Sequence, residues 1–219
     1  MTVELTVELK EKLTREPVIF AVLGATGVGK TTFSGVLASE LDIPVIDEKY
    51  PENPFLEEFY KDPFKYSFPS QLKFLINASD QLMEEKCLAN ASSIRDAGNE
   101  MNRLYAKTHF EIGWMKKAEY DMYEDIYEIL DTHSSVRHPD VLICLFAEPS
   151  VIAERIVKRG RPFELKMLKE CPRYFSKLNS QVLQYSRELS NSILIDANDD
   201  SFVDGHHLNK LVGEINKRI

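Results

Sequence analysis

The stretch of sequence that decides the fold is Gly24-Ala25-Thr26-Gly27-Val28-Gly29-Lys30-Thr31. It follows the pattern G-x-x-x-x-G-K-[ST], in which glycines let backbone N–H groups turn toward phosphate oxygens and the next helix points its positive end at the same anion. Lys30 would reach the β- and γ-phosphates, and the hydroxyl of Thr31 would bind Mg²⁺. We therefore expect residues Gly24 to Thr32 to bind ATP or another nucleoside triphosphate, with Mg²⁺.

Apolar runs on both sides of this loop predict a parallel sheet. The predicted strands are short, mostly apolar segments at residues 18–23, 43–46, 87–94, 141–146 and 193–196, the third of them weak and polar. Helical periodicity is found over residues 32–41, 150–158 and 204–219, and most of residues 55–135 is also predicted to be helical. A strand–loop–helix–strand order places helices on the faces of a parallel sheet. We predict an α/β P-loop NTPase fold with five parallel strands flanked by helices.

The chain as a whole has 219 residues, enough for one α/β domain with a substantial core. We assign residues 1–16, which fit either a strand-like arm or a frayed helix, to an N-terminal extension, and residues 17–219 to a single domain. A net charge of -8 argues against a nucleic-acid partner. No apolar run reaches the ~18 residues of a membrane span, and no secretory signal is evident. Because the three cysteines are widely separated, we expect a cytoplasmic protein.

The segment after the second predicted strand carries longer motifs. Residues 47–63 read DEKYPENPFLEEFYKDP, and YSFPSQ follows at residues 66–71. This closely resembles the deoxynucleoside kinase family, especially its bacterial purine members, in which a glutamate closes the second strand, N-P-(F/Y)-L and F-Y-x-D-P follow, and a glutamine comes later. Residues 137–140 (RHPD) also match, and residues 154–164 (ERIVKRGRPFE) are similar to the family's arginine-rich lid. The similarity spans about residues 18–180.

The resemblance implies a role for each matching residue on the acceptor side. Glu48 would accept the proton of the sugar 5′-hydroxyl as general base. Tyr60 and Glu164 would hold the sugar 3′-hydroxyl, because a phenol and a carboxylate can share a group that both donates and accepts. Gln71 would read the base.

The resemblance also implies a set of cations around the phosphates. The lid arginines Arg155, Arg159 and Arg161 would bind the triphosphate, since a planar guanidinium matches phosphate oxygens. Lys30, Arg95 and Arg159 would stabilise the phosphoryl group during transfer.

The third family signature is degenerate in this chain. Its best placement is Ile94-Arg95-Asp96 followed by Glu100, with Ile94 where the family has an acid that helps hold Mg²⁺. Arg95 and Glu100 keep the family spacing, and Glu100 is placed near the base and the substrate. Asp96 is close by, but strand alternation leads us to expect its side chain on the opposite face. Ala78 replaces a family arginine of the base pocket, and the following Tyr-Ala-Lys at 105–107 fits the family's Phe-Ala-x only with one residue inserted.

We therefore predict an ATP-dependent kinase that phosphorylates the 5′-hydroxyl of a 2′-deoxynucleoside, with purines favoured, in nucleotide salvage. Two alternatives stay open: a non-catalytic nucleotide-binding relative, for which Ile94 is the best argument, and a nucleoside monophosphate kinase of the thymidylate kinase type. The second would need a further cationic site for the phosphate of the acceptor. By resemblance alone we also expect a homodimer.

Overall fold

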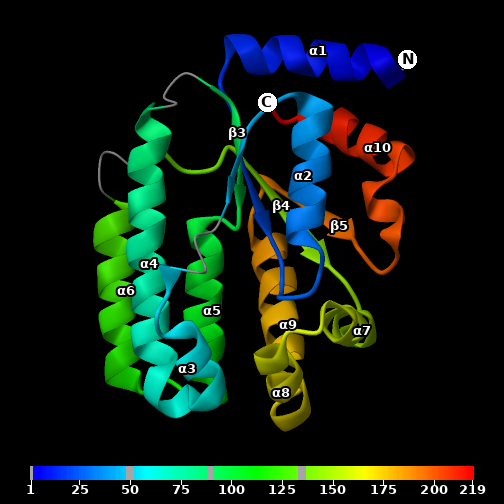
Figure 1. The fold of residues 1–219 in the computed structure, drawn as a ribbon. Coiled ribbons are helices and arrows are strands. Elements are labelled where there is room, and N and C mark those ends of the chain that lie inside the picture. Colours follow the sequence, from blue (N-terminus) through cyan, green and yellow to red (C-terminus); the bar gives the residue numbers. More distant parts are fainter. Residues whose placement is uncertain (1, 48–51, 88–90, 133–136) are drawn as a thin grey trace.

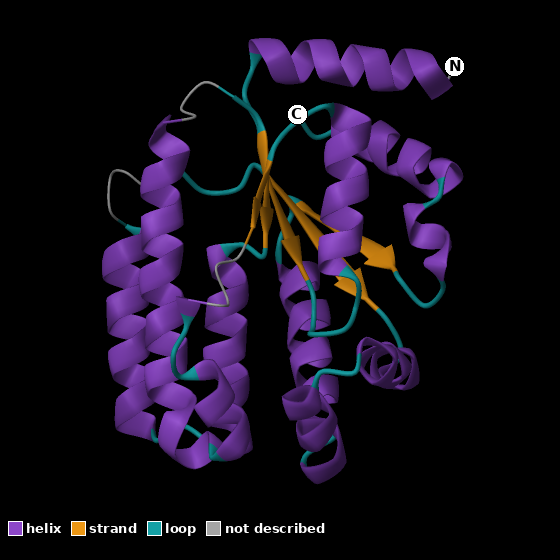
Figure 2. Ribbon diagram, viewed as in Figure 1, coloured by secondary structure: helices purple, strands orange, loops and turns teal. Residues whose placement is uncertain are grey.

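The computed structural model describes residues 2–47, 52–87, 91–132 and 137–219, and its centre is a five-stranded parallel sheet (Figures 1 and 2). The strands are β1 (Ile19–Leu23), β2 (Val45–Asp47), β3 (Ser93–Asp96), β4 (Val141–Phe146) and β5 (Ser192–Asp196). Their spatial order is β2-β3-β1-β4-β5. The predicted fold is confirmed, although β2 and β3 end later than expected, at Asp47 and Asp96.

Ten helices are found in the described part of the chain. They are α1 (Thr2–Arg15), α2 (Lys30–Leu41), α3 (Leu56–Lys61), α4 (Pro63–Cys87), α5 (Asn99–Ile112), α6 (Lys117–Asp131), α7 (Pro149–Arg159), α8 (Pro162–Glu170), α9 (Arg173–Glu188) and α10 (Gly205–Asn216), with a short 3₁₀ helix, η2, at Asp200–Val203. Helices α4, α5 and α6 pack together on one side of the molecule, and α9 packs against β4 and β5 (Figure 1). None of the helices in the described ranges has both the length and the apolar character needed to cross a membrane.

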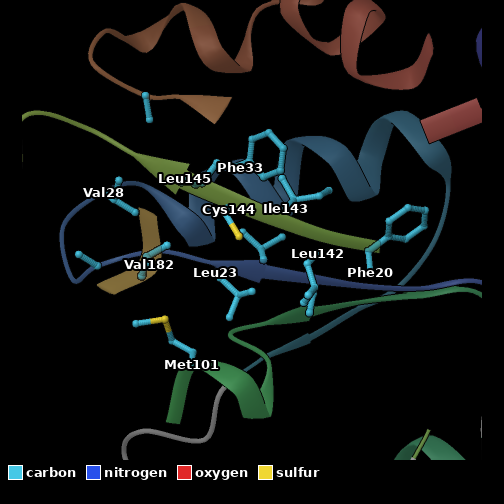
Figure 3. Packing of buried hydrophobic residues seen from close by; sticks show 14 of the residues in the cluster. Phe20, Leu23, Val28, Phe33, Met101, Leu142, Ile143, Cys144, Leu145 and Val182 are labelled. Atoms are coloured by element: carbon cyan, nitrogen blue, oxygen red, sulfur yellow. The ribbon is translucent and has the colours of Figure 1, made fainter. Parts of the chain in front are cut away.

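The core lies on both faces of the two central strands. Every residue of β1 is buried, as expected for a strand covered by helices on both sides. Figure 3 shows Phe33 of α2 on one side of β1 and β4 and Met101 of α5 on the other. Phe33 and Met101 are fully buried. This packing on both faces holds the strand ends that carry the site in place.

The N-terminal segment, left open between an arm and a helix, is the helix α1. Its Leu9 and Leu13 are buried, and α1 packs against α10 and α2 (Figure 1). Helix α1 is apolar on its inner face and charged on its outer face, the usual pattern of a surface helix. The division into an extension at 1–16 and a domain at 17–219 stays a prediction.

The sheet topology determines where a ligand can bind. Strands β2 and β3 lie on one side of β1, and β4 and β5 lie on the other. The connections to the neighbouring strands therefore run to opposite sides of the sheet at β1. In open α/β sheets ligands bind at the carboxyl ends of the strands beside such a point. The loop that leaves β1 at this point is the glycine-rich loop.

Candidate active site

The glycine-rich loop has the backbone that phosphate binding requires. Gly27 and Gly29 have φ angles of 88° and 113°, which side-chain-bearing residues rarely adopt, and α2 begins directly afterwards at Lys30. The Lys30 Nζ donates to the carbonyl oxygen of Gly24 at 2.9 Å, so the ammonium group lies over the loop. The helix N-terminus and this cation together form an anion site.

A cavity of about 570 Å³ opens in front of this loop. Its walls come from the loop, the ends of β2 and β3, helices α3 to α5, and the lid formed by α7, Gly160 and α8. The lining residues are Thr26, Gly27, Gly29, Lys30, Thr31, Thr32, Asp47, Leu56, Phe59, Tyr60, Gln71, Phe74, Asp96, Tyr105, Arg159, Arg161, Phe163, Glu164 and Tyr174. The remaining residues predicted in the loop, Gly24, Ala25 and Val28, are buried behind it.

The structure brings together the two residues predicted to hold the sugar. Tyr60 on α3 and Glu164 on α8 both line the cavity, and both are buried. Glu164 accepts hydrogen bonds from Arg159 Nη2 at 2.6 Å and Arg161 Nη1 at 3.3 Å. Burial raises the pKa of Tyr60 well above its ordinary value, helped by the nearby Tyr105 and Glu164. Tyr60 therefore keeps its proton and remains a donor beside a carboxylate acceptor.

Gln71 lines the same cavity, on α4. Its side chain is 3% exposed, and within the described ranges its Oε1 has no hydrogen-bond partner. Buried polar atoms are nearly always paired, so this oxygen is available to accept a hydrogen bond from a group that enters the cavity. Phe74, one helical turn further along α4, supplies an apolar wall next to it.

Asp96 lies beside Lys30 and Thr31 of the phosphate loop, and its placement corrects the expectation from strand alternation. Ile94 and Asp96 are two residues apart, so they lie on the same face of β3. Ile94 is fully buried in the core, whereas Asp96 at the strand end lines the cavity. The Thr31 hydroxyl donates to Asp96, and Lys30 also lies near it. Burial is the main cause of the raised pKa of Asp96, which Lys30 and Thr31 oppose.

Arg95 and Glu100 are not brought to the cavity. Arg95 points to the loop before β4, where its Nη2 donates to the Arg137 carbonyl oxygen at 2.6 Å. Glu100 is buried beside Arg95, and its pKa is raised chiefly by that burial. Arg95 precedes Asp96 on β3 and therefore faces away from the phosphate loop, and Glu100, at the start of α5, lies close to it in the interior. Neither residue is among those that line the cavity, and their predicted contacts with phosphate and substrate stay predictions.

The first lid arginine also differs from its expected place. Arg155 Nη1 donates to the carbonyl oxygens of Val28 at 3.0 Å and Ala197 at 2.7 Å, and its guanidinium lies over the ring of Phe202. Arg155 therefore supports the phosphate loop from behind rather than lining the cavity. Arg159, one helical turn later, does line it.

The predicted general base, Glu48, lies outside the described residues. The structure describes β2 up to Asp47, the preceding residue, and Asp47 lines the cavity.

Other cavity residues were missed because they are aromatic and read as ordinary core. Phe59 and Tyr174 belong to a cluster around His109, whose ring stacks on Phe59 with centroids 4.6 Å apart. The Nδ1 atom of His109 is hydrogen-bonded to the Ser67 hydroxyl at 2.8 Å. Complete burial lowers the pKa of His109 to about 3, so it is neutral and serves as packing beneath the cavity floor. The helical spacing from Gln71 to Phe74, three residues apart on α4, was the available signal.

Comparisons with known proteins identify the family of this chain. The sequence model described as "Deoxynucleoside kinase" matches residues 20–219. The chain is 35% identical over 151 residues to a deoxyadenosine/deoxycytidine kinase of Bacillus subtilis, covering 68% of each chain. It is 29% identical over 203 residues to a deoxyadenosine kinase of Dictyostelium discoideum, covering 92% of this chain and 80% of the other. The structure of a deoxyadenosine kinase from M. mycoides with bound dATP superposes with a TM-score of 0.76 and 25% identity, over 91% of this chain and 99% of that one. The chain therefore belongs to the deoxynucleoside kinase family, a family of phosphotransferases.

Proposed function

We propose that this protein transfers the γ-phosphoryl group of Mg·ATP to the 5′-hydroxyl of a 2′-deoxynucleoside, with purines favoured, for nucleotide salvage in the cytoplasm. The observation that carries the proposal is a cavity whose walls combine the phosphate loop with Tyr60, Gln71 and Glu164. A triphosphate on the loop and a nucleoside against α3, α4 and α8 would then occupy one space of about 570 Å³. Direct transfer requires this proximity of donor and acceptor.

The sugar would be held by Tyr60 and Glu164. The protonated phenol donates and the carboxylate accepts, so together they satisfy both functions of a 3′-hydroxyl. Arg159 and Arg161 hold Glu164 by hydrogen bonds. Because these arginines come from the lid, binding of the sugar and closure of the lid over the phosphates would be linked.

The base would be read by Gln71. Its Oε1, which has no hydrogen-bond partner among the described residues, would accept a hydrogen bond from an amino group or ring N–H of the base. Phe74 would pack on the base from the same helix. The names of the relatives, deoxyadenosine/deoxycytidine kinase and deoxyadenosine kinase, make deoxyadenosine the first substrate to test.

Glu48 would act as general base. It directly follows Asp47, which lines the cavity, and the family resemblance gives it this role. General bases typically contribute about 10²- to 10⁴-fold in rate.

Mg²⁺ would be held by the Thr31 hydroxyl together with the Asp96 carboxylate. The two side chains are hydrogen-bonded at the edge of the phosphate loop, and oxygen donors of this kind suit Mg²⁺. In the described ranges, no group of three or more His, Cys, Asp or Glu side chains is placed to hold a metal alone, so the triphosphate would supply further ligands. The bound ion would neutralise charge on the β- and γ-phosphates.

Charge on the transferring group would be stabilised by Lys30, Arg159 and Arg161, which all line the cavity. Guanidinium and ammonium groups held in place before the reaction stabilise the transition state without further reorganisation. We assign no substrate contact to Arg95, because its guanidinium is used at the Arg137 carbonyl.

A homodimer is proposed through α4 and α6. These helices pack together, and they carry four exposed large apolar side chains, Phe64, Ile76, Met122 and Ile129. Exposed apolar side chains that gather on one surface often mark an interface. Sedimentation of the wild type and of Met122→Glu/Ile129→Glu tests this: a dimer that becomes a monomer is expected, and a monomeric wild type would refute it.

The activity is tested by incubating the protein with Mg·ATP and each deoxynucleoside, or each deoxynucleoside monophosphate. We expect phosphorylation of nucleosides, deoxyadenosine among them, and loss of that activity in Glu48→Gln. Product from monophosphates alone would identify a monophosphate kinase instead. Retained ATP binding without turnover of either class would identify a non-catalytic relative.

A further inference from the structure

A hydrogen bond crosses the cavity between the donor and acceptor sides. The Thr26 hydroxyl and the Tyr105 phenol are 2.8 Å apart, although they are separated by 79 residues in sequence. Thr26 belongs to the phosphate loop, Tyr105 belongs to α5, and both line the cavity. The roles proposed above use neither side chain.

Of the two side chains in this hydrogen bond, Tyr105 is the one whose position is set by the core. Helix α5 is anchored by buried side chains on several of its faces, among them Met101, Leu104 and Ala106. The phenol also lies close enough to Tyr60 to contribute to the raised pKa of that residue. Tyr105 therefore belongs to the wall against which the nucleoside would pack, and its position is set by the core rather than by the loop.

Thr26 is the side chain through which the turn of the loop at Gly27 can be held. The loop turns at Gly27 and again at Gly29, both with positive φ and neither with a side chain that could anchor it. Glycine has the largest conformational freedom of any residue, so a loop built on two of them loses entropy when it becomes ordered. A side-chain hydrogen bond immediately before Gly27 restricts the loop before a phosphate arrives.

We propose that Tyr105 is a positioning residue that holds the phosphate loop in its binding conformation through the Thr26 hydroxyl, and that a nucleoside packed against its ring strengthens triphosphate binding. The first half concerns the phosphate loop alone, and the second half rests on the proposed function. Preorganisation of this kind raises affinity by lowering the cost of ordering on binding. One neutral hydrogen bond corresponds to roughly 2- to 10-fold in affinity.

Two conservative variants and their combination isolate this bond. Tyr105→Phe keeps the ring, Thr26→Val keeps the shape of the side chain, and the double variant removes both hydroxyls. Tyr185→Phe on α9 is the matched control, because it makes the same chemical change outside the cavity walls. Thermal unfolding of all variants checks that the fold is retained.

The first measurement is calorimetric binding of adenylyl imidodiphosphate with Mg²⁺, without any nucleoside. We expect the dissociation constant to rise roughly 2- to 10-fold in each single variant, and to rise no further in the double variant, since both changes remove the same bond. Tyr185→Phe should bind like the wild type. Unchanged or tighter binding in Tyr105→Phe, or effects that add in the double variant, would overturn the proposal.

The second measurement repeats the titration with saturating deoxyadenosine. The wild type should bind the triphosphate analogue more tightly than before, and Tyr105→Phe should lose most of that gain. In steady state the same variant should raise KM for ATP more than KM for the nucleoside, a split that a general loss of packing would not give. A wild type that binds no deoxynucleoside would refute the proposed function, while the first titration would still decide the role of Tyr105.

Discussion

Replacing Ile94 with aspartate tests which residue of β3 faces the phosphates. From the sequence alone this change restores a missing acid and should raise activity. The structure predicts the opposite, because Ile94 is fully buried in the core and Asp96 already occupies the strand end. We therefore expect Ile94→Asp to destabilise the protein without any gain in turnover.

The size of the effect follows from two costs. Removing a buried isoleucine side chain costs about 2–5 kcal/mol, as seen in large-to-small core substitutions. The new carboxyl must also be neutral in the core, and protonating an acid of ordinary pKa near 3.9 at pH 7 costs up to about 4 kcal/mol at 1.36 kcal/mol per unit. The sum is comparable with the whole stability of many domains, about 5–15 kcal/mol.

Urea unfolding followed by Trp114 fluorescence measures this loss, with Ile94→Val as the matched control at about 1 kcal/mol. The new carboxyl would have a pKa raised by folding, so its ionisation penalty is absent below the unfolded pKa and grows as the pH rises above about 4. The deficit relative to the wild type should therefore be smaller at pH 4.5 than at pH 7. A wild-type midpoint together with faster turnover would refute the placement of β3.

Three further changes test individual side chains. Asp96→Asn should weaken Mg²⁺-dependent binding of ATP by about 10- to 100-fold, as for other residues that orient metal ligands, while metal-free ATP binding is retained; equal Mg²⁺ titrations of the two proteins would contradict this. Tyr60→Phe should raise KM for deoxyadenosine by up to about 10-fold, from one lost hydrogen bond, and should leave turnover of 2′,3′-dideoxyadenosine unchanged; an equal effect on both substrates would show that Tyr60 does not contact the 3′-hydroxyl. Burial lowers the pKa of His109 to about 3. The stability that the neutral, buried imidazole contributes is therefore complete above the unfolded pKa near 6.5 and is lost as the pH falls toward 3. Between pH 7 and 5 the free energy of unfolding of the wild type should fall by about 2 kcal/mol more than that of His109→Gln. Parallel urea titrations at the two pH values measure that difference, and identical slopes would exclude it.

The phosphate loop could be predicted because its chemistry is local. Eight consecutive residues fix two glycine turns, a lysine and a helix start, and no distant contact is needed to interpret them. Tyr60, Gln71 and Glu164 are far apart in sequence, and only the family resemblance linked them before the structure placed them in one cavity. In the lid, helical spacing predicted a shared face for Arg155 and Arg159 but not their partners. Arg155 contacts the back of the phosphate loop, whereas Arg159, one turn further along the helix, binds Glu164 at the cavity.

The third family motif could not be placed reliably from the sequence, because the register of a strand is set by pairing with its neighbouring strands and not by its own residues. The sequence Ser93–Asp96 has little apolar alternation, so several placements of an acid at the strand end are equally acceptable from sequence. In the sheet, Asp96 pairs with Val22 of β1 and with Asp47 of β2, and these two long-range pairings bring it level with the start of the phosphate loop. Arg95 must then point to the other face, where the Arg137 carbonyl receives it. A one-residue change of register would exchange these two faces, which is why the acid beside Thr31 could be found only after the strands on both sides were in place.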